Sequence, residues 1–73
     1  MKKTSPEFLS QVHHLLDGLR DETPERDVIV DSLQYRVKGL IHLALQGQEN
    51  LVDVGLEIIS PEIEELVATS KKK

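Results

Sequence analysis

The sequence contains no cysteine, so neither a disulfide bond nor a thiolate metal site can stabilise the fold. The same absence gives no sign of an oxidising compartment. At 73 residues the chain allows one domain, and a domain of this size buries only roughly 60% of its unfolded surface. Burial and ordering entropy then nearly cancel. Because oligomerisation is the remaining common way to stabilise so small a domain, we expect a homodimer.

Long hydrophobic runs are also missing. The basic start Met1-Lys2-Lys3-Thr4 is not followed by an apolar stretch of the length that a signal peptide or a membrane span requires. We therefore expect a soluble cytoplasmic protein that has no membrane association.

Positive charge is scarce outside the two ends of the chain. The net charge is −4, from 9 cationic and 13 acidic residues, and five of the cations are Lys2, Lys3, Lys71, Lys72 and Lys73. Residues 4–70 hold the other four cations and all 13 acids, a balance of −9. Such a body repels phosphate backbones, so nucleic acid is disfavoured as a partner except through the lysines. We expect residues 1–4 and 70–73 to be flexible tails around one helical domain at 5–69.

Motifs of catalysis and cofactor binding are absent as well. The chain has no glycine-rich phosphate loop and no serine elbow, and no pair of acids stands out in an apolar stretch. His13 and His14 are adjacent, which points them about 100° apart on a helix, and His13 with Asp17 supplies fewer ligands than zinc needs. We predict no enzymatic activity, no cofactor and no metal site.

Helix signals, in contrast, recur along the chain. Ser5-Pro6-Glu7 is typical of a helix start, because Ser can cap, Pro suits the first helical position and Glu complements the helix dipole. Apolar residues then recur at helical spacing: Phe8, Val12, Leu15 and Leu19. This pattern predicts a helix over about 5–21 that packs against another helix.

The longest predicted helix covers residues 24–46. Thr23 and Pro24 form its start signal, in which we expect the Thr hydroxyl to accept a backbone N–H bond. Gly47 suits the left-handed residue that ends a helix. The short connection to the preceding helix predicts an antiparallel hairpin. The core-facing stripe consists of Ile29, Val30, Leu33, Val37, Leu40, Ile41 and Ala44.

The segment after Gly47 is ambiguous. Residues 52–58 alternate like a strand, but no second strand pattern exists to pair with them within the chain, so we favour a helix near 50–59 that is capped by Asn50. A strand paired with a second subunit is the alternative. Ser60-Pro61-Glu62 repeats the first start signal and predicts a separate helix at 61–69. The expected fold is all-α, a hairpin followed by two short helices, with two copies pairing as a dimeric helical bundle.

Two surfaces are candidate interaction sites. The central helix carries a second row of residues beside its core stripe, with small residues that permit close approach and two larger ones that could anchor a contact. This row consists of Val28, Ser32, Tyr35, Gly39 and His42. The last predicted helix bears three acids, Glu62, Glu64 and Glu65, which form a candidate docking face for a basic partner.

These observations favour a small non-enzymatic protein-interaction module, such as a regulator, inhibitor, adaptor or docking element, that acts through an acidic helical surface. The alternative is a nucleic-acid-associated regulator that uses its lysine tails on a dimeric helical hairpin. No motif in the chain is typical of a known family.

Overall fold

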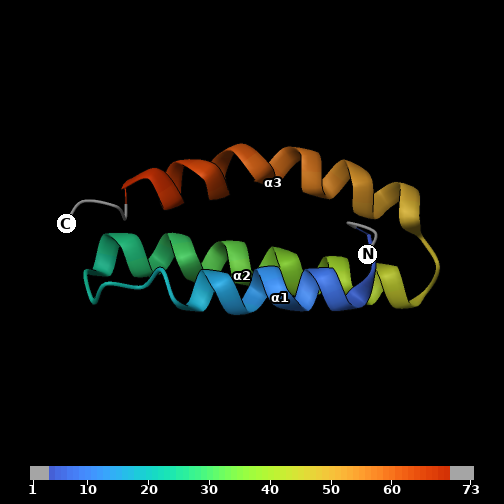
Figure 1. Cartoon of the computed structure of the whole chain (residues 1–73), viewed down its shortest axis with the longest axis horizontal. Coiled ribbons are helices and arrows are strands. Elements are labelled where there is room, and N and C mark those ends of the chain that lie inside the picture. Colours follow the sequence, from blue (N-terminus) through green and yellow to red (C-terminus); the bar gives the residue numbers. More distant parts are fainter. Residues whose placement is uncertain (1–3, 70–73) are drawn as a thin grey trace.

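The computed structural model describes residues 4–69, which form three helices and contain no strand. Helix α1 covers Pro6–Asp17, α2 covers Pro24–Leu45 and α3 covers Glu49–Thr69. The chain reverses direction at each connection, so α1 and α3 run opposite to α2 (Figure 1). The all-α prediction is confirmed, and the segment for which a strand was the alternative is helical.

Helix α2 is the central element of the fold. Both α1 and α3 pack along it, whereas α1 and α3 make hardly any close backbone contact with each other. The shared core is apolar and includes residues from all three helices. Its buried members are Leu9, Leu16, Val30, Leu33, Val37, Leu40, Val52, Ile59 and Leu66.

The start of α1 follows the sequence prediction and the start of α2 does not. The Ser5 hydroxyl accepts a hydrogen bond from the Phe8 N–H at 3.1 Å, and Pro6 lies at the first helical position. The Thr23 hydroxyl instead donates to the Asp21 carboxylate at 2.6 Å and caps no backbone N–H. A hydrogen bond to a charged carboxylate is stronger than the neutral hydrogen bond that a capping hydroxyl would accept. The prediction that Thr23 caps α2 is therefore wrong.

Helix α3 is one continuous helix, so the prediction of two short helices at 50–59 and 61–69 is wrong. Pro61 lies inside it, on the exposed side. An interior proline costs about 3 kcal/mol, but burying one Ile or Leu side chain contributes about 1.5–3 kcal/mol. A single helix keeps an apolar stripe in phase on both sides of Pro61, comprising Val52, Leu56, Ile59, Ile63 and Leu66. The burial along that stripe outweighs the defect.

The connection between α2 and α3 turns at Gly47. Its φ of +80° is the left-handed conformation that glycine adopts without strain, as the sequence predicts. Helix α3 then begins at Glu49, one residue earlier than expected, and the Gln48 carbonyl accepts the N–H bonds of Leu51 and Val52. Asn50 is therefore inside the helix, and the prediction that it caps the helix is wrong.

A polar network joins α1 to α2. The buried Gln34 side chain donates to the His13 carbonyl at 3.1 Å and accepts from the Arg20 guanidinium at 2.7 Å. Arg20 also bonds to Asp31 and Asp17. These hydrogen bonds, that to Asp31 first, raise the pKa of Arg20. The network fixes the axial position of α1 on α2.

Arg26 of α2 anchors the C-terminal end of α3. Its guanidinium donates to the Leu19 carbonyl at 2.9 Å, the Leu66 carbonyl at 2.7 Å and the Thr69 hydroxyl at 2.8 Å. Asp21 lies 3.8 Å from the same group. One side chain of α2 thus holds both the α1–α2 connection and the last turn of α3.

None of the helices within residues 4–69 combines the length and the apolar character needed to cross a bilayer. The predicted flexible tails fall largely on residues 1–3 and 70–73, which lie outside the described residues. Thr4, the described residue of the predicted N-terminal tail, is buried against the fold, with 9% of its surface exposed.

Candidate functional site

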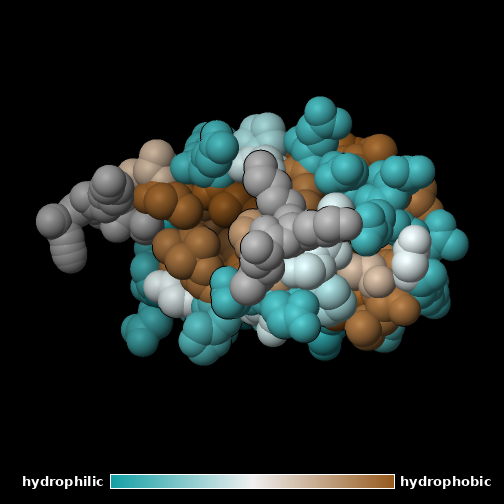
Figure 2. All heavy atoms as spheres, turned by 45° about the vertical axis from the view of Figure 1, so that its right-hand side comes forward, coloured by the Kyte–Doolittle hydropathy of each residue, from teal (hydrophilic) through white to brown (hydrophobic). Residues whose placement is uncertain are grey.

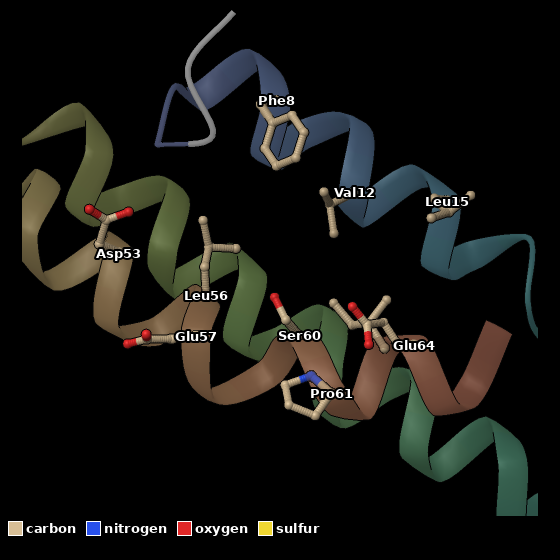
Figure 3. A pocket seen from close by; sticks show the side chains of 10 residues that line it. Phe8, Val12, Leu15, Asp53, Leu56, Glu57, Ser60, Pro61 and Glu64 are labelled. Atoms are coloured by element: carbon tan, nitrogen blue, oxygen red, sulfur yellow. The ribbon is translucent and has the colours of Figure 1, made fainter. Parts of the chain in front are cut away.

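A groove of about 700 Å³ runs between α1 and α3 (Figure 3). Its α1 wall is apolar and consists of Phe8, Val12 and Leu15. Its α3 wall is mixed and consists of Asp53, Leu56, Glu57, Ser60, Pro61, Ile63 and Glu64. In the space-filling view, brown hydrophobic side chains gather between bands of hydrophilic ones (Figure 2). The groove is thus an apolar surface with a polar border on one side.

The groove exists because α1 and α3 both pack on α2 rather than on each other. Two helices that each pack antiparallel on a third occupy three of the four positions of a four-helix bundle. The fourth position, between α1 and α3, is the groove. The Leu15 side chain remains 53% exposed in the groove, although leucine side chains are usually buried.

The charge of the groove is negative and lies on one wall. Asp53, Glu57 and Glu64 follow one another at spacings of four and seven residues, which places them on one side of α3. No cation is among the described residues that line the groove. Any charged ligand of this site must therefore be positive where it meets α3.

The chemistry that the groove can perform is narrow. Its reactive groups are three carboxylates and the Ser60 hydroxyl, and no histidine, cysteine or lysine among the described lining residues could activate that hydroxyl. Within residues 4–69 no cluster of three or more His, Asp or Glu residues is arranged to hold a metal ion.

The structure places the five residues of the predicted interface row together. Val28, Ser32, Tyr35, Gly39 and His42 all lie exposed on the face of α2 that points away from the core. Tyr35 is 79% exposed and Val28 is 65% exposed. An added Cβ at Gly39 would meet no atom within 4 Å, so this glycine makes no close helix contact within the chain.

Close approach occurs at Gly55 instead. A Cβ at this position would overlap with the Leu40 side chain, so the absence of a side chain allows α3 to lie against α2. The sequence analysis overlooked this role because Gly55 was read within the ambiguous segment rather than on a helix face.

The three acids of the predicted docking face are divided between two sides of α3. Glu64 lines the groove. Glu62 pairs with Arg36 of α2 at 3.3 Å, and it borders with Glu65 a second hollow of about 530 Å³ between α2 and α3. The acids that share a side with Glu64 are Asp53 and Glu57, which precede Pro61 in the sequence. Their common side could be found only by continuing the helix through Pro61.

No family model, curated protein or solved structure matches this chain. The site is therefore interpreted from its own residues.

Proposed function

We propose that this chain is a small non-enzymatic protein-interaction module, and that the groove between α1 and α3 receives a helical segment of a partner protein. The observation that carries the proposal is the vacant fourth position of the helical bundle. It lies between α1 and α3, which both pack on α2. A helix docked there would cover Phe8, Val12 and Leu15 on one side and Leu56 and Ile63 on the other. Laying an apolar helix face into such a groove is a common mode of peptide recognition.

The dimensions of the groove suit a helix. Its lining on α3 runs from Asp53 to Glu64, which at 1.5 Å per residue is roughly 16 Å, or about three helical turns. Apolar residues at spacings of three and four on a docked helix would meet the apolar residues of both walls.

A site-specific photocrosslinker tests this proposal in cells of the native host. Placed at Leu15, in the groove, it should capture a partner protein; placed at Leu45, which is 69% exposed and outside the groove, it should not. A Leu56→Asn substitution should reduce the adduct from position 15. Equal adducts from both positions, or none from position 15, would contradict a groove that binds a partner.

We propose separately that two copies pair through the outer face of α2, the row that contains Tyr35 and Gly39. Supporting this are the exposure of Tyr35 and Val28 and the open space above Gly39, which would let a second helix approach closely. Pairing through the groove would instead bring the carboxylates of two copies together.

The dimer proposal predicts separate effects on folding and on mass. Gly39→Leu blocks close approach and Tyr35→Ala removes contact area, so both variants should keep parental circular dichroism but show a monomer mass by light scattering. A Leu45→Ala variant is the control, because Leu45 is exposed and lies outside this row. Parental association in both test variants, or a monomeric parent at tens of micromolar, would reject the proposal.

The nucleic-acid alternative depends on Lys2, Lys3 and Lys71–Lys73, which lie outside the described residues. Binding to nucleic acid that falls steeply with salt would favour it, and no binding at low salt would remove it. The cytoplasmic location also remains a prediction.

A further inference from the structure

We propose that the groove selects a cationic amphipathic helix: a partner segment of about three turns with an apolar stripe and with lysine or arginine along the edge that faces α3. This inference rests on the proposed function, because it names the chemistry of the segment that the same groove would receive.

The first argument is the asymmetry of charge across the groove. Asp53, Glu57 and Glu64 are its only charged lining residues within the described part of the chain, and all three belong to α3. The facing wall of α1 is apolar. A docked helix would therefore need cations on one edge and apolar residues on the other, in addition to its buried stripe.

The second argument is the proline inside α3. Pro61 has no N–H, so it cannot donate the helical hydrogen bond that the Glu57 carbonyl would otherwise accept. Both residues line the groove. A backbone acceptor without its usual donor thus lies close in sequence to the carboxylates, and Lys or Arg side chains supply donors to both kinds of group.

The third argument disfavours a second copy of this chain as the occupant. Residues 4–70 carry a balance of −9, and three of their four cations already form ion pairs with acids of their own chain, Arg20 with Asp31, Arg26 with Asp21 and Arg36 with Glu62. A helix of the same chain would bring acids toward acids, which disfavours association.

The acid spacing also sets a pattern for the partner. Because Asp53, Glu57 and Glu64 lie four and seven residues apart, cations of the docked helix should recur at matching intervals along one edge. The fit then depends on where the cations are, as well as on how many there are.

Three synthetic 15-residue helical peptides test the inference on the full chain. They share one leucine stripe and carry Lys, Gln or Glu at the edge positions, and binding is measured by fluorescence anisotropy. We expect the Lys peptide to bind about ten-fold or more tightly than the Gln peptide, the Glu peptide to bind weakest, and the Lys affinity to fall with salt.

Variants of the protein locate the contact. Glu57→Gln and Glu64→Gln should each weaken the Lys peptide by about two- to five-fold and leave the Gln peptide unchanged. Glu65→Gln is the matched control on the other side of α3 and should have no such effect. Leu15→Asn should weaken the Lys and Gln peptides alike, because it removes part of the apolar wall.

The outcomes separate the two proposals. If the Lys and Gln peptides bind equally and both respond to Leu15→Asn, the groove binds helices but the preference for cations is overturned. If Glu65→Gln weakens the Lys peptide as much as Glu64→Gln does, attraction to the whole acidic surface replaces the groove and overturns the inference. If no peptide binds while position 15 still captures a partner in cells, the partner is not a cationic helix. If both experiments fail, the proposed function fails with the inference.

Discussion

The α1–α2 pair and the α1–α3 pair differ in how their facing surfaces are satisfied. Between α1 and α2, Gln34 reaches a backbone carbonyl of α1, and Arg20 forms ion pairs with Asp17 and Asp31. Between α1 and α3 the groove has apolar side chains and three carboxylates, with no cation among the described residues that line it. In the first contact, Gln34 and Arg20 find their polar partners within the chain. In the function that we propose, a partner protein supplies the other half of the second surface.

This comparison also separates the roles of two groups of charged residues. Arg20 and Arg26 hold connections and helix ends within the fold. Asp53, Glu57 and Glu64 occupy one side of a single helix, which suits the recognition of a positive ligand. Substitutions of the arginines should therefore change stability, and substitutions of these acids should change binding.

The largest expected effect comes from breaking the core that both helix pairs share. Leu33 of α2 is 1% exposed, so Leu33→Ala should lower the free energy of unfolding by about 2–5 kcal/mol, because it leaves a cavity. Urea or thermal unfolding followed by circular dichroism measures this. Leu45→Ala is the control and should change stability by less than about 0.5 kcal/mol. A parental melting temperature for Leu33→Ala would show that this side of α2 does not face the core.

A smaller loss is expected from Arg26→Met, which keeps an unbranched apolar stem and removes the guanidinium bonds to the Leu19 and Leu66 carbonyls. Hydrogen bonds of charged groups contribute about 1.5–3 kcal/mol, and the loss should be in this range. Hydrogen exchange should increase most in the last turn of α3.

Arg36→Met is the matched control for this prediction. Its pair with Glu62 has side chains that are 47% and 49% exposed, so the cost should stay below about 1 kcal/mol. Equal losses in the two variants would remove the distinction between the hydrogen bonds of the mostly buried Arg26 side chain and the surface ion pair of Arg36.

Gly39 and Gly55 test the difference between a helix face that is open to solvent and one that packs against another helix. Gly39→Ala should raise stability by up to about 1 kcal/mol, because Ala favours helix and the added methyl meets no atom within 4 Å. Gly55→Ala should gain less or lose stability, since the methyl displaces Leu40 in the core. Chemical denaturation of both variants at low protein concentration checks the order. The reverse order would place the close contact at Gly39.

The smallest expected effect concerns pH. Hydrogen bonds from the Thr23 hydroxyl and then the Thr23 N–H hold the pKa of Asp21 below its ordinary value. A depressed pKa contributes stability that is present above the unfolded value of about 4 and is lost as the pH falls through the folded value. Thr23→Val should therefore destabilise the protein at neutral pH, and the difference from the parent should shrink at about pH 2.5. Parallel melts at the two pH values measure it; a difference that stays constant would mean that the bond to Asp21 does not matter.

Local chemistry made much of the fold predictable. Ser5, Pro6 and Gly47 each act through their own covalent structure, and each marks the end of a helix in the structure. The stripe of α2 was also readable, because Val30, Leu33, Val37 and Leu40 repeat at helical spacing and are buried. The predicted stripe also included Ile29, which is 46% exposed, so this part of the prediction is wrong.

The errors arose where distant residues compete with a local signal. Pro61 resembles a helix start, but burial on both sides of it in α3 overrides that preference. Thr23 resembles a helix cap in the sequence, but in the structure its hydroxyl donates to the Asp21 carboxylate instead. The groove could not be located from the sequence, because it depends on α1 and α3 both packing on α2 without meeting. Its acids were present in the sequence, yet Glu57 and Glu64 were assigned to different helices.

The central place of α2 also has a consequence for folding kinetics. Its contacts are with the helices that directly precede and follow it, so contact formation can begin with a short chain closure at each connection. Low contact order of this kind is associated with folding in microseconds to milliseconds. Because α1 and α3 hardly touch, either hairpin can form first and serve as the surface on which the third helix docks. We therefore expect two routes to the same structure, and a mutation that delays one route should leave the other open.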